Sequence, residues 1–294
     1  MFDSKKYNWS ISHKISIRFV FAKVHFILYS PNMNVYLVLG LNFLPFILFL
    51  IILLLSKVKA SKLLLPLLFM LFSLVPIILI QYVVSPLFSD RNVQQYGLLI
   101  LLLGAILDFG LVEEGFKSLA LLFAPSKDIS FSHFFIISML AGLLLGCCES
   151  TIYFLNGVKG MLSNTPSRSV EILPVVFLRM ATSDMIHMLC AGLCGVFVWT
   201  AKSKKINFFP LIGAVFVHGL YDYFILVQLN VFFALVTLLF AASQCRIWYV
   251  RIKNNEVKIT FFMVGDWIDK FPDATKKIND AGHEIASHSN THPH

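Results

Sequence analysis

The sequence predicts an all-α membrane protein, a polytopic transmembrane helical bundle of about seven to eight spans, followed by a short truncated α/β tail. Of the 294 residues, 57% are hydrophobic and only 14% are charged, and the mean hydropathy is +0.78. A soluble domain does not have this composition. Long apolar runs recur along the chain, and they stop after Val250, where a polar segment begins.

Seven apolar runs have about the length that a hydrocarbon core of roughly 30 Å requires of a helix. They define a membrane domain over residues 35–250, between a basic N-terminal segment (1–34) and a tail (251–294). The expected spans are Val35–Leu55, Leu63–Val84, Leu98–Ala124, Phe134–Val158, Ile172–Thr200, Pro210–Gln228 and Val231–Val250.

Basic residues predict the orientation of these spans. Within the N-terminal segment, Ile15–Leu28 mixes basic and apolar residues, which favours an interfacial or re-entrant segment. Elsewhere the basic residues cluster after the first, fifth and seventh spans, on one side that we expect to be cytoplasmic. We therefore expect a multi-pass integral membrane protein with these loops in the cytoplasm. The basic clusters are Lys57, Lys59 and Lys62; Lys202, Lys204 and Lys205; and Arg251 and Lys253.

The net charge of +8 does not indicate a nucleic-acid partner. Much of the basic excess flanks apolar runs, as in juxtamembrane anchoring to a lipid bilayer, and no nucleic-acid motif is present. The five cysteines are an odd number without a CxxC pair, so packing in the helical bundle explains them better than disulfides or a thiolate metal site.

The third span carries charges that a simple membrane anchor would not contain. Glu113, Glu114 and Lys117 lie beyond its midpoint, where each charge costs on the order of 2.5–3.5 kcal/mol on insertion scales. Glu113 and Lys117 are four residues apart and share a helix face. An internal ion pair is the structural alternative, but it leaves one acid over. We therefore expect a functional site that faces the interior of the bundle.

Three further spans supply candidate partners for these charges. The fourth contains Glu149, one turn before Tyr153, and Glu149 is equally well explained as a structural partner of Lys117 or Arg179. In the fifth span, His187 follows Asp184 by three residues, a spacing that lets a carboxylate orient an imidazole. The sixth contains His218 and Asp222 on one face. These residue types suit the activation of a water molecule, with or without a metal ion.

The order of these motifs resembles the PrsW family of intramembrane proteases, which are relatives of the CAAX-prenyl-protease and bacteriocin-processing (CPBP) superfamily. The motifs are EExxK at Glu113–Lys117, ExxxY at Glu149–Tyr153, the span with Arg179 and His187, and HxxxD at His218–Asp222. The resemblance implies hydrolysis of peptide bonds in membrane-anchored proteins that resemble anti-sigma factors, and hence a role in signalling. It also implies a location in a bacterial cytoplasmic membrane.

By this resemblance Glu113 is the base that activates water and Glu114 assists it. His187 and His218 would bind the water or stabilise the oxyanion, with Asp222 in support. We assign supporting roles to Lys117, Glu149 and Arg179.

Because no HExxH spacing is present, we expect no cofactor, with zinc as the less favoured option. On the expected orientation Glu113 lies nearer the cytoplasmic end of its span, which conflicts with cleavage at the outer face. A proton- or ion-coupled transporter and a non-catalytic scaffold remain alternatives.

The tail belongs to a different class of sequence. Thr260–Trp267 predicts a strand and turn, and Pro272–Ala281 predicts an amphipathic helix. The segment that follows resembles the polysaccharide deacetylase (NodB) domain, whose HxxxH metal motif would be His288 and His292. The TFDDGP element of that family is missing, and so few residues would not bury a core. We therefore expect an inactive remnant.

Overall fold

The computed structural model describes residues 35–56, 58–84, 97–127, 129–162, 172–227, 231–256, 260–280 and 284–289. The predicted interfacial or re-entrant segment Ile15–Leu28 lies outside the described residues. By its internal contacts the chain divides into two compact units, of which the first ends at Tyr249 and the second begins at Val250.

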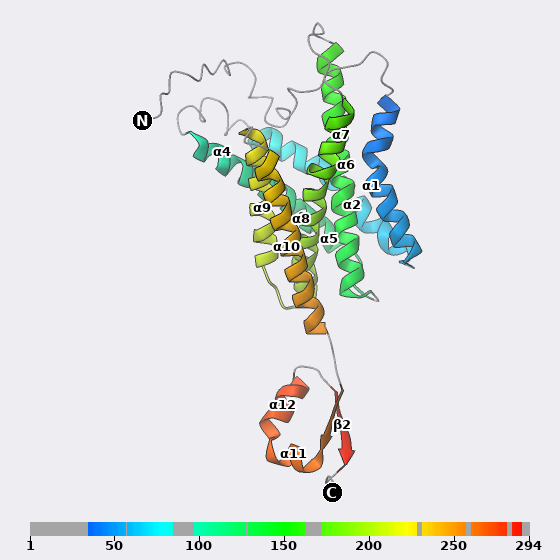
Figure 1. Cartoon of the computed structure of the whole chain (residues 1–294), viewed down its shortest axis with the longest axis vertical. Coiled ribbons are helices and arrows are strands. Elements are labelled where there is room, and N and C mark those ends of the chain that lie inside the picture. The colour runs from blue at the N-terminus through cyan, green and yellow to red at the C-terminus, as the bar shows by residue number, and fades with distance from the viewer. Residues whose placement is uncertain are drawn as a thin grey trace. The chain divides into compact units, whose positions relative to one another are not determined.

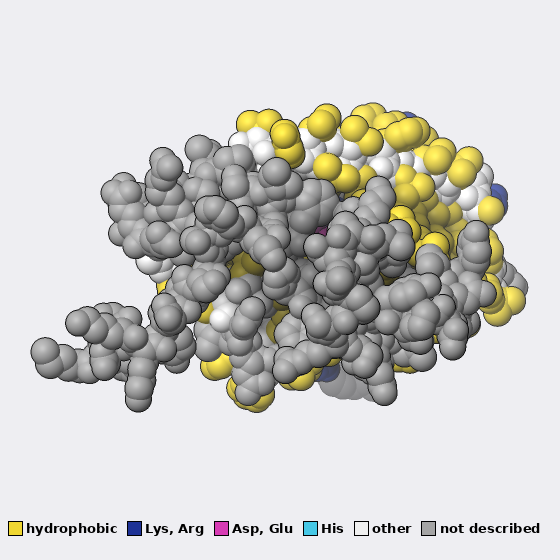
Figure 2. Space-filling view, turned by 90° about the horizontal axis from the view of Figure 1, so that it is seen from above, with side chains coloured by type: hydrophobic (Ala, Val, Ile, Leu, Met, Phe, Trp, Pro, Cys, Tyr) yellow, Lys and Arg dark blue, Asp and Glu magenta, His cyan; other side chains and the backbone are white. Residues whose placement is uncertain are grey.

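The first unit is a bundle of helices, as the hydropathy pattern predicts (Figure 1). Among the described residues, six helices are long and apolar enough to cross a membrane. Apolar side chains cover much of the outer rim of the described helices in Figure 2, where a bilayer would surround them. The helical segments are α1 Val35–Leu55, α2 Ala60–Val84, α4 Leu98–Gly104, η2 Ala105–Leu111, α5 Val112–Leu122, α6 Phe131–Leu162, α7 Ile172–Ala181, α8 Ser183–Lys202, α9 Phe209–Leu226 and α10 Val231–Glu256.

Two predicted spans differ from simple helices. The third predicted span, Leu98–Ala124, forms α4 and α5 with a π-helix, η2, between them. It is too rich in charge to count among the six apolar helices. A π-helical turn shifts the faces of the two helices that it joins, and such turns are frequent at functional sites. The fifth predicted span, Ile172–Thr200, is broken at Thr182, which has a non-helical backbone (φ −124°, ψ −68°) between α7 and α8.

The lysine-bearing loops lie at one end of the bundle. Lys62 at the start of α2 donates to the carbonyl of Lys127 at 3.3 Å, and Lys202 at the end of α8 donates to the carbonyl of Ala124. Both loops therefore meet the connection between α5 and α6. The alternation of charge along the sequence corresponds to a physical grouping of lysines at this end.

The second unit is a small βαβ arrangement. Strand β1 (Thr260–Val264) pairs in parallel with β2 (Glu284–Ser289), and helices α11 (Gly265–Lys270) and α12 (Pro272–Asp280) connect them. The predicted strand and turn is thus a strand followed by a short helix. Met263 is the only buried residue among the described residues of this unit. His288 lies in β2, whereas its predicted partner His292 lies outside the described residues.

Candidate functional site

The polar residues predicted on four separate spans come together inside the bundle. Glu113, Glu114 and Lys117 lie on α5 and are buried, as are His187 on α8 and His218 and Asp222 on α9. Glu149 on α6 reaches the same cluster, because its carboxylate oxygen lies 2.6 Å from His187.

Small residues let α6 and α8 approach closely enough to form this site. A Cβ atom added to Gly142 of α6 would lie 2.3 Å from Ala191 Cβ and 2.5 Å from the carbonyl oxygen of His187. One added to Gly146 would lie 3.0 Å from Asp184 Cα. This small-xxx-small pattern is typical of packed membrane helices. It brings the backbone of His187 against α6, where Glu149 follows Gly146 by less than one turn.

A second close contact brings α9 against η2. A Cβ atom on Gly219 would lie 2.6 Å from Ile106 Cα, and one on Gly110 would lie 2.3 Å from the carbonyl oxygen of Val215. Gly219 directly follows His218, and Gly110 precedes Glu113 by three residues. The contact therefore positions the imidazole of α9 beside the carboxylate of α5.

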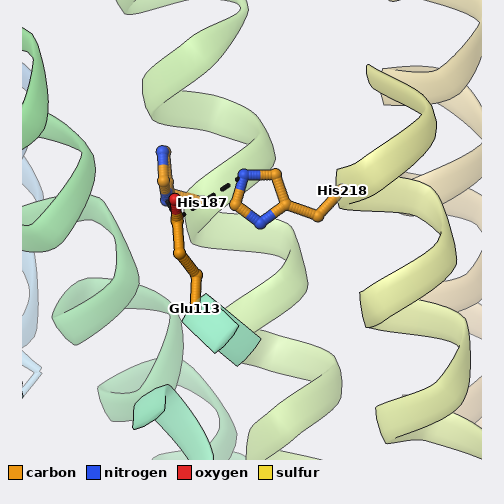
Figure 3. A group of neighbouring side chains, drawn as sticks. All are labelled: Glu113, His187 and His218. Atoms are coloured by element: carbon orange, nitrogen blue, oxygen red, sulfur yellow. Dashed lines mark ion pairs between the residues drawn. The ribbon is translucent and has the colours of Figure 1, made fainter. Parts of the chain in front are cut away.

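Glu113 faces the two histidines with one carboxylate oxygen (Figure 3). Its Oε2 atom lies 3.6 Å from His187 Nδ1 and 3.7 Å from His218 Nε2. One ligand atom from each of the three residues lies within 4.8 Å of the others, so the group could hold a metal ion. The two rings meet edge to face, with centroids 4.8 Å apart.

The other nitrogen of each imidazole contacts a different carboxylate. His187 Nε2 lies 2.6 Å from Glu149 Oε2, and His218 Nδ1 lies 2.6 Å from Glu114 Oε1. In metal sites, the ring nitrogen of a histidine that does not bind the metal almost always donates to a carboxylate, a carbonyl or water. Such a bond fixes the tautomer, so that the nitrogen facing Glu113 carries the lone pair. The donor set therefore fits a metal ion. Asp222 Oδ2 flanks His218 Nε2 at 3.5 Å.

The two adjacent glutamates have different surroundings. Glu114 Oε1 accepts from Lys117 Nζ at 2.5 Å and from His218 Nδ1, while its Oε2 accepts from the thiol of Cys194 at 3.2 Å. Both oxygens of Glu114 are thus used to hold neighbouring side chains. Glu113 Oε2 instead faces the two histidines. The geometry therefore distinguishes Glu114, which holds its neighbours with both oxygens, from Glu113, which faces the two imidazoles.

Lys117 is the internal cation of the cluster. Besides its short contact with Glu114, its Nζ atom lies 3.0 Å from His187 Nδ1 and 4.0 Å from Glu113 Oε2. In this arrangement the ammonium donates to the lone pair that would bind a metal ion. Binding of a metal at His187 would displace this hydrogen bond.

A second polar network surrounds the break between α7 and α8. Arg179 lies 3.5 Å from Glu149 and donates to Ser150 and Ser183. Asp184, which we expected to orient His187, accepts from Ser150 at 2.7 Å instead. The other oxygen of this carboxylate lies 3.9 Å from the thiol of Cys147, which is also on α6. Glu149 contacts His187 in its place, and Arg179 supports Glu149.

Gln81 and Cys194 contact the glutamates but were not among the predicted site residues. Gln81 Nε2 donates to Glu113 Oε1 at 2.9 Å, and Cys194 contacts Glu114. An amide within an otherwise apolar span was a signal that sequence reasoning could have used, because it needs a polar partner in the membrane. Cys194 gave no such signal, since thiols are common in buried helix contacts.

Comparison with known proteins separates the two parts of the chain. The profile of the polysaccharide deacetylase family matches residues 248–294. A peptidoglycan-N-acetylglucosamine deacetylase of Bacillus cereus is 42% identical over 43 residues, which are 15% of this chain and 16% of that protein. The chain therefore spans about one sixth of the length of this relative. No solved structure matches the chain.

The bundle matches a different family. The profile described as PrsW family intramembrane metalloprotease covers residues 60–244, more than half of the chain and all four motifs of the buried cluster. This description of the family as metalloproteases favours a metal ion in the site, whereas the sequence alone led us to favour a metal-free site. By this match the chain belongs to the PrsW family of intramembrane metalloproteases.

Proposed function

We propose that the bundle is an endopeptidase that cleaves membrane-anchored proteins, and that Glu113, His187 and His218 hold one divalent metal ion at its reactive centre. The observation that carries this proposal is the convergence of Glu113 Oε2, His187 Nδ1 and His218 Nε2, with the opposite nitrogen of each ring against a carboxylate. Two imidazoles and one carboxylate are a ligand set that suits catalytic zinc. Zinc is therefore the favoured ion.

A bound zinc ion supplies Lewis-acid polarisation and makes a water molecule a better nucleophile. The protein side chains hold and orient this centre. Glu149 and Glu114 fix the two rings, and Asp222 lies beside the ring of His218. Glu149 is 25% exposed, while Glu113 is 7% exposed, so Glu149 is the less buried of the two carboxylates.

Glu113 is the essential carboxylate with or without a metal. With a metal ion bound, its Oε2 atom would be a ligand. In metal-free chemistry, the same oxygen takes a proton from water while the water oxygen adds to the scissile carbonyl carbon. The proton then passes to the leaving amine as the C–N bond breaks. Chelation distinguishes the two mechanisms, because only the first requires an ion.

For the substrate we propose a membrane-anchored regulator of the anti-sigma-factor type, in a bacterial cytoplasmic membrane. The lysine-bearing end of the bundle would be cytoplasmic. His187 precedes Lys202 by fifteen residues of α8, which is roughly 22 Å at 1.5 Å per residue. The site would thus lie deep within the bilayer, away from the lysine-bearing surface.

For the tail we propose no deacetylase activity. The sequence contains no TFDDGP element ahead of His288 and His292. Without that element the tail lacks the aspartates that the resemblance assigns to the base and to a metal ligand. His288 and His292 would then be remnants of a metal motif.

Cleavage of a tagged, single-pass anti-sigma-factor-like protein in membranes tests the proposal. We expect cleavage by the full chain, loss of cleavage with Glu113→Gln, and loss on chelation that added zinc restores. Ser73→Ala is the matched control, because Ser73 donates within its own helix to the carbonyl of Met70. Cleavage that persists with Glu113→Gln would contradict the proposal, and ion flux lost in that variant would favour a transporter.

A further inference from the structure

Helix α2 carries a buried amide on an otherwise apolar surface. One stripe of the helix faces the bundle, at intervals of three or four residues, and it ends at Gln81. The neighbours Tyr82 and Val83 are 66% and 71% exposed, on the side where lipid would lie. The buried stripe consists of Leu63, Pro66, Met70, Ser73, Ile77 and Gln81.

The partners of Gln81 are both acceptors from the third predicted span. Its Nε2 atom donates to Glu113 Oε1 at 2.9 Å and lies 3.4 Å from the carbonyl oxygen of Asp108, a residue of the π-helix. Because a carboxylate and a carbonyl oxygen can only accept, the amide nitrogen and not its oxygen must face them. A buried amide in a membrane is stabilised only when such partners exist.

This contact divides the two oxygens of Glu113 between two tasks. Oε1 is held by Gln81, and Oε2 faces His187 Nδ1 and His218 Nε2. A carboxylate without this restraint could rotate and present either oxygen, or both. With the restraint it presents one oxygen towards the position between the histidines.

We propose that Gln81 is a positioning residue that fixes Glu113 as a one-oxygen ligand of the metal centre; this inference rests on the proposed metal-binding role of Glu113. Gln81 does not touch the proposed metal position, since its contact is with the opposite carboxylate oxygen. It acts through Glu113, as the carboxylates act through the histidines. Helix α2 thereby contributes to a site whose sequence motifs lie on other helices.

Binding of zinc alone to the purified, metal-stripped full chain in detergent tests this role. Gln81→Leu removes the donor with little change in size, and we expect zinc affinity to fall about 10–100-fold, as for other partners of metal ligands. Gln81→Glu should weaken binding as well, because it puts a second carboxylate against Glu113 Oε1. Ser73→Ala, two turns earlier on the same stripe, should bind zinc as the unchanged protein does.

Comparison with Glu113→Gln separates the possible results. If Glu113→Gln loses zinc and Gln81→Leu keeps its full affinity, the role of Gln81 is wrong while the metal centre stands. If Glu113→Gln binds zinc as tightly as the unchanged protein, both the metal centre and the role of Gln81 are wrong. Thermal unfolding in detergent shows whether a variant is folded. If Gln81→Leu binds zinc more weakly but unfolds at the same temperature as Ser73→Ala, the result supports the role of Gln81 in positioning Glu113.

Discussion

The bundle and the C-terminal unit both carry histidines and acids, but they build them into structure in opposite ways. In the bundle, residues more than a hundred positions apart, such as Glu113 and His218, meet in a buried cluster. In the C-terminal unit, the motif is local in sequence, and Met263 is the only buried residue among those described there. A recognisable sequence motif therefore does not by itself show that the residues form a buried site.

The difference lies in what surrounds the polar groups. Glu113, Glu114 and Lys117 each lie against several polar partners in the bundle, and such pairing offsets the cost of a charge at membrane depth. Lys117, for example, lies against both Glu114 and His187. The small unit exposes its polar groups to solvent, where no such pairing is required. If this comparison is right, substitutions in the bundle should have large effects and those in the tail small ones.

The largest effect is expected for Glu113→Gln. The substitution keeps the size of the side chain but removes the charge that faces His187 and His218. We expect the rate of cleavage to fall at least about 10³-fold, as for the loss of a residue that acts at the reacting centre. The rate of appearance of the cleaved tagged substrate measures this. A decrease of less than tenfold would contradict the assignment.

Glu114→Gln should act on stability. Glu114 holds Lys117, His218 and Cys194, and its removal leaves a buried ammonium without its main partner. Breaking a buried ion pair in this way costs about 3–5 kcal/mol. Unfolding in detergent, followed by denaturant titration, measures the loss. Stability equal to that of the unchanged protein would show that Glu114 does not hold the cluster together.

Gly142→Ala should separate α6 from α8. The added methyl group meets Ala191 and the carbonyl of His187 at 2.3 and 2.5 Å, so the helices must move apart. We expect a loss of about 1–3 kcal/mol, typical of overpacking, together with slower cleavage. Gly213→Ala is the control, because nothing lies within 4 Å of the added Cβ atom. Equal stability of the two variants would contradict the close packing.

Glu149→Gln should weaken the support of His187. The carboxylate contacts His187 Nε2 and Arg179, and its loss leaves an amide to hold the imidazole. We expect a decrease of about 10–100-fold in zinc affinity or cleavage, as for comparable partners of metal ligands. Competition with a chromophoric chelator measures the affinity. An unchanged affinity would assign Glu149 a purely structural role.

The smallest effect is expected in the tail. Simultaneous substitution of His288→Ala and His292→Ala in the full chain should change cleavage by the bundle less than about twofold, within the range of surface substitutions. The unchanged chain should release no acetate from an N-acetylglucosamine oligomer above background. Acetate release that depends on these histidines would overturn the distinction between the two units.

Several features followed from the sequence because they are local. Hydropathy identified the helical membrane class, since a bilayer demands long apolar helices. The helix period put Glu113 with Lys117 and His218 with Asp222, which lie 4.0 and 3.5 Å apart. The βαβ character of the tail was only half evident, because β2 is stabilised by pairing with β1 rather than by its own pattern.

The sequence by itself determined the class of protein, most of its helices and the residue types of the cluster. Only the tertiary structure decided which of them touch. It pairs His187 with Glu149 rather than Asp184, gives Gln81 to Glu113, and distinguishes Glu113 from Glu114. The physical reason is that contacts within a helix follow its period, whereas contacts between helices depend on backbone approach. That approach is set by small residues such as Gly142 and Gly219 and by the π-helix η2.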